Sequence, residues 1–180
     1  MTVILLTGCA SSPKTNFYTL NVVPGETGRR SISFPVQLAA VHLPPSLDRR
    51  QMVSMTDQNS VKVSETNRWS GALDEMVRNV LSQDLAARLP KGKVILPEAP
   101  APGNTGTLVV TIAQFGPDAS GEVKLNGSWA LLNAGSPTPV LERDVLLNAG
   151  PAASPDATAA AMSQALGQLA NKIAAALSEE

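Results

Sequence analysis

Residues whose side chains most often carry chemistry are sparse in this sequence. Of its 180 residues, one is a cysteine, Cys9, and one is a histidine, His42. His42 lies in an apolar stretch typical of a strand, where a lone histidine is more often structural than catalytic. A nucleophilic pair of Cys9 and His42 would require the N-terminal segment to fold back onto that strand. Zinc sites built from several cysteines and histidines are excluded by their number.

The remaining catalytic patterns are also weak. The sequence contains no G-x-S-x-G elbow and no G-x-x-x-x-G-K-[ST] phosphate-binding loop. Asp74 and Glu75 lie beside Arg78 on a predicted helix, where solvated ion pairs are the expected interpretation. We therefore expect no catalytic activity, no bound metal and no cofactor. A hydrolase stays open as an alternative because serines and aspartates are present, but it would need a convergent acid and base.

The sequence around Cys9 is more informative than the cysteine alone. Residues 6–9, Leu-Thr-Gly-Cys, follow a Val-Ile-Leu run and resemble a bacterial lipobox, in which the cysteine is acylated and the preceding segment is removed. The apolar run is shorter than the usual ~7 to 15 residues and has no basic start, so we expect the rest of the signal to lie upstream of Met1. Residues 1–15 are expected to form the truncated signal, lipobox and tether, with a covalent lipid on Cys9. A stray N-terminal cysteine is the alternative.

Composition narrows the remaining classes of function. A hydrophobic content of 43% fits one globular domain, which we place at residues 16–180. The net charge of -1 and the scattered basic residues argue against a nucleic-acid partner. No stretch of 18 apolar residues is present in the sequence, so no helix is expected to span a bilayer. Because only 3% of the residues are aromatic, Trp69 and Trp129 are expected to be important in the core.

Hydrophobic periodicity predicts strands followed by a helix, and then the same order again. Short strands are expected at residues 35–43, 51–56, 60–64, 93–96, 108–115, 122–132 and 140–148. Helices are expected over residues 73–89 and 157–177. This order predicts an α+β domain with an antiparallel or mixed sheet and two main helices packed on one side.

Finer predictions accompany these elements. Both faces of residues 35–43 carry aliphatic side chains, which indicates a strand covered on both sides. Asn67 or Ser70 is expected to cap the first helix, and Arg88 is expected on one of its polar faces. Trp69 is expected at the entrance of this helix, packed on the sheet.

Five segments of the sequence, taken in order, resemble the ABC-type transport auxiliary lipoproteins. They are residues 17–20 after the lipobox, residues 35–53, the Arg68-Trp69 pair before the first helix, residues 115–129 and residues 166–174. Each segment alone is common, since any amphipathic helix could supply the last one. Their order and spacing make the resemblance specific, and it spans most of the chain.

This resemblance implies an outer-membrane lipoprotein that faces the periplasm and has no catalytic role. It implies two partners, a periplasmic protein of the mammalian-cell-entry (MCE) type and an inner-membrane ABC transporter, which handle lipids or other apolar molecules. It also implies a ring-like homo-oligomer. Ala10, directly after the cysteine, agrees with the family's sorting to the outer membrane. The alternative is a periplasmic lipoprotein that binds a lipid or another small ligand in an apolar cavity.

Asp48, Arg49, Arg68 and Trp69 are the candidate site residues of the domain. One interpretation is structural, in which an ion pair and a core aromatic fix the junction between strand and helix. The other is functional, in which charged residues grouped at this junction contact other subunits or the transport partner. The sequence leaves both interpretations open.

Overall fold

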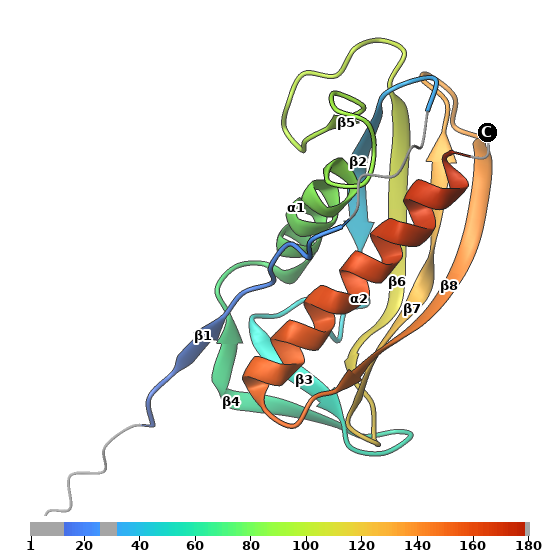
Figure 1. The fold of residues 1–180 in the computed structure, drawn as a ribbon. Helices are drawn as coiled ribbons and strands as arrows, with labels where there is room; N and C mark the ends of the chain where they lie inside the picture. The colour runs from blue at the N-terminus through green and yellow to red at the C-terminus, as the bar shows by residue number, and fades with distance from the viewer. Residues whose placement is uncertain (1–12, 26–31, 179–180) are drawn as a thin grey trace, which may run out of the picture.

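The computed structural model describes residues 13–25 and 32–178, which contain eight strands and two helices (Figure 1). In chain order they are β1 (Asn16–Tyr18), β2 (Val36–His42), β3 (Gln51–Met55), β4 (Val61–Trp69), α1 (Leu73–Ala86), β5 (Val94–Ile95), β6 (Gly106–Pro117), β7 (Glu122–Leu132), β8 (Pro139–Pro151) and α2 (Pro155–Ala176). The strands form one five-stranded and one three-stranded sheet. Both sheets are mixed, which confirms the predicted α+β class.

The five-stranded sheet, in the order β5-β2-β6-β7-β8, carries most of the core. β5, β2 and β6 run parallel, whereas β6, β7 and β8 form an antiparallel meander. Both helices cover one face of this sheet, because α1 contacts β2 and β5, α2 contacts β6, β7 and β8, and the helices contact each other (Figure 1). The predicted packing of two main helices on one side is confirmed.

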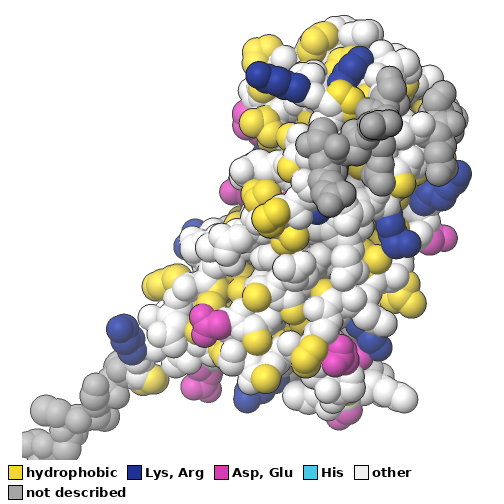
Figure 2. All heavy atoms as spheres, viewed as in Figure 1, with side chains coloured by type: hydrophobic (Ala, Val, Ile, Leu, Met, Phe, Trp, Pro, Cys, Tyr) yellow, Lys and Arg dark blue, Asp and Glu magenta, His cyan; other side chains and the backbone are white. Residues whose placement is uncertain are grey.

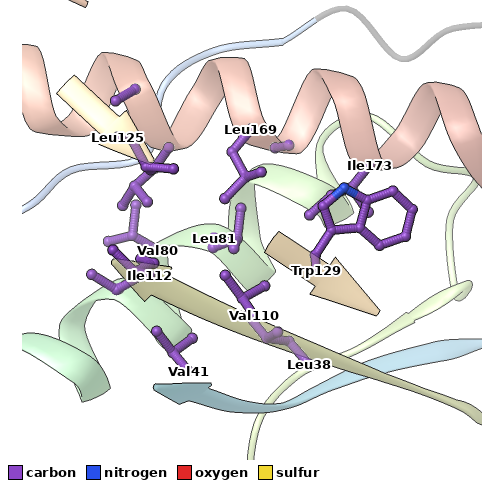
Figure 3. Packing of buried hydrophobic residues seen from close by; sticks show 14 of the residues in the cluster. Leu38, Val41, Val80, Leu81, Val110, Ile112, Leu125, Trp129, Leu169 and Ile173 are labelled. Atoms are coloured by element: carbon purple, nitrogen blue, oxygen red, sulfur yellow. The ribbon is translucent and has the colours of Figure 1, made fainter. Parts of the chain in front are cut away.

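Alternation along β7 shows why this face is buried. Val123, Leu125, Trp129 and Leu131 are at most 2% exposed, while Asn126 between them faces solvent. Figure 3 shows Leu125 and Trp129 on the side of the sheet that faces α2, where Leu169 and Ile173 meet them. Full burial of each large apolar side chain contributes about 1.5–3 kcal/mol, so this layer accounts for much of the drive to fold.

The two helices begin in different ways. At α2, the Ser154 side chain accepts a hydrogen bond from the backbone N–H of Ala157 at 3.1 Å, which satisfies one of the free N–H groups of the first turn. At α1, the cap residue is Ala72, which offers no side-chain acceptor. The prediction that Asn67 or Ser70 caps α1 is therefore wrong, and Asn67 instead belongs to β4.

Strand β2 is covered on one face only. Val36, Leu38 and Val41 are buried, whereas Ala39 and His42 are exposed. The pairing register with β6 shifts between Leu38 and Ala40, and this bulge explains why two buried residues lie three positions apart. The prediction of a strand covered on both sides is wrong because the bulge makes its two faces look equally apolar in the sequence.

The three-stranded sheet, in the order β1-β4-β3, lies at one end of the molecule (Figure 1). β4 runs on to Trp69, so this tryptophan ends a strand and is 3% exposed. β1 pairs in parallel with the end of β4, although the sequence pattern does not predict a strand there. Across the described residues, neither helix has the length and apolar character needed to cross a membrane.

Candidate functional site at the anchor-proximal junction

Two of the candidate site residues, Arg68 and Trp69, lie where the chain from the N-terminal segment joins the domain. On one side of β4, Phe17 of β1 pairs with Arg68 and Tyr18 pairs with Trp69. On the other side, the Trp69 backbone N–H donates to the carbonyl oxygen of Arg50 at 2.6 Å. We call these five residues the junction. Because it includes β1, the first described strand, the junction fixes how the domain follows its N-terminal segment.

Backbone and amide contacts lock β1 into place. The Ser70 N–H donates to the Tyr18 carbonyl oxygen at 2.8 Å. Asn67 accepts on its side-chain oxygen from the Tyr18 hydroxyl at 3.3 Å and from the Asn16 amide at 3.2 Å. Trp69 beneath them belongs to the continuous apolar core. A three-residue strand therefore gains tertiary contacts that its own sequence does not indicate.

The charged candidates in and beside the junction form no ion pair in the described part of the chain. Asp48 and Arg49 are exposed just before β3, and neither joins an ion pair there. Arg68 is half-buried, and its buried Nε has no hydrogen-bond acceptor among the described residues. Trp69 is the core aromatic that the structural interpretation requires, but the ion pair of that interpretation is not formed among these residues. Cys9 lies outside the described residues.

His42 lies at the exposed end of β2, beside a shallow hollow of about 270 Å³ that Asp48 and Asp74 also line. This grouping of one histidine with two carboxylates is not evident from the sequence, because the three residues come from three elements. Within residues 13–25 and 32–178, however, no three His, Cys, Asp or Glu side chains come close enough together to hold a metal ion.

A larger groove lies between the two sheets. It measures about 530 Å³ and runs along β3 to the start of α2. Its apolar lining comprises Met52, Val53, Met55, Pro117, Ala119, Ala152, Ala153 and Pro155, and its polar lining comprises Ser54, Thr56, Lys62, Ser64, Asn67, Asp118, Ser154 and Thr158. A second hollow of about 380 Å³ shares Val53, Met55 and Pro117 with the first. We call the two hollows together the β3 groove.

The turn between β6 and β7 closes one end of the β3 groove and is held by Asp118. Its carboxylate forms an ion pair with Lys124 at 2.7 Å and accepts from the Ser120 hydroxyl at 2.6 Å. The Lys124 ammonium, followed by the Ser120 hydroxyl, holds the pKa of Asp118 well below its ordinary value. The carboxylate is therefore ionised at neutral pH and keeps the turn closed.

A buried charge pair at the end of α1 was not predicted from the sequence. Asp84 is fully buried and Arg88 is 2% exposed, so the prediction of Arg88 on a polar face is wrong. The Arg88 guanidinium lies 3.5 Å from the Asp84 carboxylate and donates to Asn171 of α2 at 2.7 Å. The spacing of an acid four residues before a base, within a stripe of buried leucines, is the signal that could have found it.

This pair holds down the segment that follows β1. The Val23 backbone N–H donates to Asp84 at 2.8 Å, and the Val23 carbonyl oxygen accepts from Arg88 at 3.3 Å. The Asn21 N–H donates to the Ser163 hydroxyl of α2 at 3.1 Å. We call residues 20–25 the strap and Asp84 with Arg88 the clamp. The strap lies across both helices and is held through side chains.

The strap fits too closely for larger residues at two positions. A Cβ atom added at Gly25 would lie 2.6 Å from the Arg88 guanidinium carbon, and one added at Gly167 of α2 would lie 2.9 Å from Cβ of Val23.

Burial raises the pKa of Asp84, and the Val23 N–H and Arg88 oppose that rise. The Val23 N–H and Arg88 both contact Oδ1 of Asp84, whereas Oδ2 has no partner among the described residues, so this buried carboxylate is incompletely hydrogen-bonded even with the strap in place.

Residues 18–174 match the family described as the ABC-type transport auxiliary lipoprotein component. The chain belongs to this family. The match begins inside β1 and includes the clamp, the β3 groove and most of the junction, whereas Cys9 precedes it.

Similar proteins agree with this assignment. The family member is 30% identical over 135 residues to the intermembrane transport lipoprotein PqiC of Escherichia coli, which covers 72% of this chain and 70% of PqiC. PqiC of Shigella flexneri matches to the same extent. The chain is thus an auxiliary lipoprotein component of an ABC-type transport system, related to PqiC at a distance.

Solved structures share the fold. A crystal structure of an uncharacterised protein superimposes with a TM-score of 0.78 at 22% identity, covering 92% of this chain and all of the other. A Xanthomonas campestris protein superimposes with a TM-score of 0.70 at 16% identity, covering 88% of this chain and 92% of its own. At these identities the likeness establishes the arrangement of sheets and helices alone.

Proposed function

We propose that this auxiliary lipoprotein is a non-catalytic component of an ABC/MCE-type lipid transport system and acts at the outer membrane of the bacterial envelope. A lipid on Cys9 anchors it, residues 1–15 provide signal and tether, and the domain from residue 16 docks or organises the periplasmic apparatus. Its partners are an MCE-type periplasmic protein, an inner-membrane ABC transporter and further copies of itself in a homo-oligomer. Membership of the family and the relationship to PqiC support this proposal.

The observation that carries the proposal is the way the N-terminal segment is built into the domain. β1 is paired with β4, and the strap is clamped across α1 and α2. A domain connected to its lipid only through a flexible tether would not need the pairing of β1 or the contacts of the strap. Because the segment leaving the tether contacts both sheet and helices, the anchor sets the position of the whole domain, which is what a docking component requires.

The partner-binding surface is expected at the charged side chains in and beside the junction. Asp48, Arg49 and Arg68 form no ion pair with one another or with other described residues, so their charges are available to a partner. Charged groups that are satisfied only in a complex favour specific partners and faster association. This supports the functional interpretation of these residues.

Intact-protein mass tests the anchor. The protein is expressed from its native upstream sequence, extracted from membranes with detergent and compared with a Cys9→Ala variant. We expect a mass that corresponds to cleavage before Cys9 plus acyl chains, and the variant should lose both. Two or more acyl chains, at about 0.8 kcal/mol per buried methylene, hold a protein firmly on a membrane. An unmodified mass in the membrane fraction would overturn the anchor.

Co-purification tests the docking function. The lipidated protein is captured from detergent extracts, and transporter and MCE-type proteins are sought by mass spectrometry. We expect both to be recovered with the native protein and reduced with Arg49→Ala and Arg68→Ala combined. Recovery that does not depend on these arginines would place the partner surface elsewhere, and loss of all partners from the native protein would refute docking.

A second candidate function rests on the β3 groove. Its volume lies within the ~300–1,000 Å³ of typical ligand sites, and Met52 and Met55 supply the adaptable lining often found at such sites. This favours a lipoprotein that binds a lipid or another apolar ligand. Lipid extraction and mass spectrometry of the purified domain test it, because a ligand lost from a Met55→Gln variant would support binding in the groove.

A further inference from the structure

We infer that the corner of the three-stranded sheet around Phe17 rests on the lipid bilayer, with the aromatic ring among the lipid chains near the surface and Lys14 beside lipid phosphates. The inference rests on the proposed function, since it takes Cys9 as the anchored residue. It goes further by assigning a membrane-contacting surface to the folded domain itself.

The length of the tether limits how far this corner lies from the anchor. Four residue steps separate Cys9 from Pro13, the first described residue, and four more lead to Phe17. At about 3.3–3.6 Å per residue, each set of four spans roughly 14 Å when fully extended. β1 leaves the body of the domain at the three-stranded sheet, whereas the C-terminal end of α2 lies at the other end (Figure 1). This corner is therefore the part of the fold closest to the anchor.

Phe17 is exposed in the domain alone, as is typical of a side chain that contacts a second surface. It is 62% exposed, while its neighbour Tyr18 packs against the core. Among the described large hydrophobic residues only Leu146, at 67%, is more exposed. A single exposed aromatic is unremarkable on most surfaces, but aromatic side chains beside a lipid anchor are typical of the membrane interface.

A basic side chain lies close to Phe17 along the chain. Lys14 is exposed three residues before Phe17, and Arg68 of β4 lies opposite Phe17. The wider corner is mixed in charge, because Arg49 and Arg50 lie beside Asp48 before β3, and the acids Glu65 and Asp74 are exposed as well, Asp74 in one hollow with Asp48. The cation that is available to lipid phosphates beside Phe17 is therefore Lys14.

Where the described chain leaves the body at the lower left of Figure 2, a basic side chain lies next to apolar ones, and acidic side chains lie on the adjoining face of the body. A lipid surface matches both kinds of group at once, because cations remain at the phosphates while the aromatic ring enters the apolar layer. A protein partner on the same corner is the alternative that the experiment must separate.

Tryptophan fluorescence on vesicles tests the inference directly. The native Trp69 and Trp129 are 3% and 2% exposed and report only the core. Phe17→Trp places a reporter at the proposed contact, and Leu146→Trp on β8 is a control of similar exposure. The full chain is coupled through Cys9, its single cysteine, to maleimide lipid in vesicles of phosphatidylethanolamine and phosphatidylglycerol, with or without brominated acyl chains.

We expect the Phe17→Trp emission to shift to shorter wavelength and to be quenched by brominated chains, with neither change for Leu146→Trp. Adding Lys14→Gln should weaken the quenching on these anionic vesicles more than on neutral ones. Coupled protein that floats with vesicles without quenching at position 17 would overturn the inference and favour a protein partner there. Equal quenching at positions 17 and 146 would also overturn it, since it would indicate adsorption without a preferred face.

Chemical coupling separates this inference from the proposed function. Because maleimide lipid supplies the anchor, the result does not depend on acylation in the cell. If the native protein is acylated but the coupled protein shows no quenching at position 17, the lipid anchor is supported and the membrane-contacting corner is refuted. Quenching of coupled protein together with an unmodified native mass would show the reverse, a corner that binds lipid on a chain without an anchor.

Discussion

Arg88, two residues past the end of α1, donates a hydrogen bond from its Nε to the side-chain oxygen of Asn171 of α2 at 2.7 Å. This contact ties the two helices together beneath the strap, at the point where Val23 also meets the guanidinium. The clamp is thus a three-way connection between the N-terminal segment and both helices. Its energetics decide how firmly the N-terminal segment is coupled to the domain.

Removing the arginine from the clamp should destabilise the protein strongly. Arg88→Met leaves Asp84 buried without its charge partner, which costs roughly 3–5 kcal/mol of unfolding free energy. Asp84→Asn in the same protein should restore much of the loss. Denaturant unfolding of the two single variants and the double variant measures the coupling.

The exposed ion pair of Arg78 with Glu98 provides the control for this cycle. The two side chains are 26% and 79% exposed, so Arg78→Met should cost no more than about 1 kcal/mol. An Arg88→Met variant as stable as Arg78→Met would show that the clamp does not hold the strap.

The second prediction concerns the pH dependence of stability and follows from the raised pKa of Asp84. Burial favours the protonated acid in the folded state, so the folded protein binds this proton more tightly than the unfolded chain. The resulting stability is fully present below the ordinary carboxyl pKa of about 4 and is lost as pH rises through the raised pKa. Relative to Asp84→Asn, the native protein should therefore lose stability as pH rises from about 4 towards neutrality.

Asp118 is a control for the pH experiment, because its pKa is shifted in the opposite direction to that of Asp84. Because Lys124 and Ser120 lower its pKa, the stability it contributes is present above the ordinary carboxyl pKa and is lost as pH falls. Asp118→Asn should thus differ from the native protein at neutral pH and converge with it in acid. Unfolding midpoints across a pH series measure both variants, and parallel curves for native protein and Asp84→Asn would contradict the assignment.

A third prediction concerns the close contact of the strap with α2. Gly167→Ala would normally stabilise a helix by about 1 kcal/mol, but here the new methyl group would meet Val23 at 2.9 Å. We expect a net loss of unfolding free energy of about 1–3 kcal/mol, as overpacking produces. Thermal or denaturant unfolding measures it.

Two further variants separate this clash from other effects on α2. Val23→Ala combined with Gly167→Ala should recover the loss, because the shorter side chain makes room for the added methyl group. Ala160→Ser, at an exposed position of the same helix, should change stability by less than about 0.5 kcal/mol. A stabilised Gly167→Ala protein would mean that the strap is not packed against α2.

Most regular elements of this fold could be predicted from the sequence because their signals are local. β7 shows alternation over its whole length, and α1 shows leucines and valines at helical spacing, so each element is encoded in its own residues. β1 is different, since Asn16, Phe17 and Tyr18 form a strand only by pairing with residues 67–69, some fifty positions later. Short-range patterns contain no information on such a partner.

The same reason explains which part of the site could be anticipated. Trp69 was expected in the core because it is a rare large aromatic, and it is buried. The burial of Arg88 could not follow from its charge, since it depends on Asp84, the Val23 backbone and Asn171, which come from three segments. The bulge in β2 likewise arises from pairing with β6, and no local pattern in the sequence predicts it.

The last prediction separates the structural and functional roles of Arg68 and Trp69, which are adjacent in β4. Trp69→Ala removes a large side chain that is 3% exposed, so it should cost about 3–5 kcal/mol of unfolding free energy. Arg68→Ala removes a half-buried guanidinium without an ion pair in the described structure, and it should cost less than about 1 kcal/mol. Its melting temperature should stay close to that of the native protein while recovery of transport partners falls. A folded Arg68→Ala protein that recovers its partners in full would assign Arg68 no part in docking, and an unfolded one would make it structural.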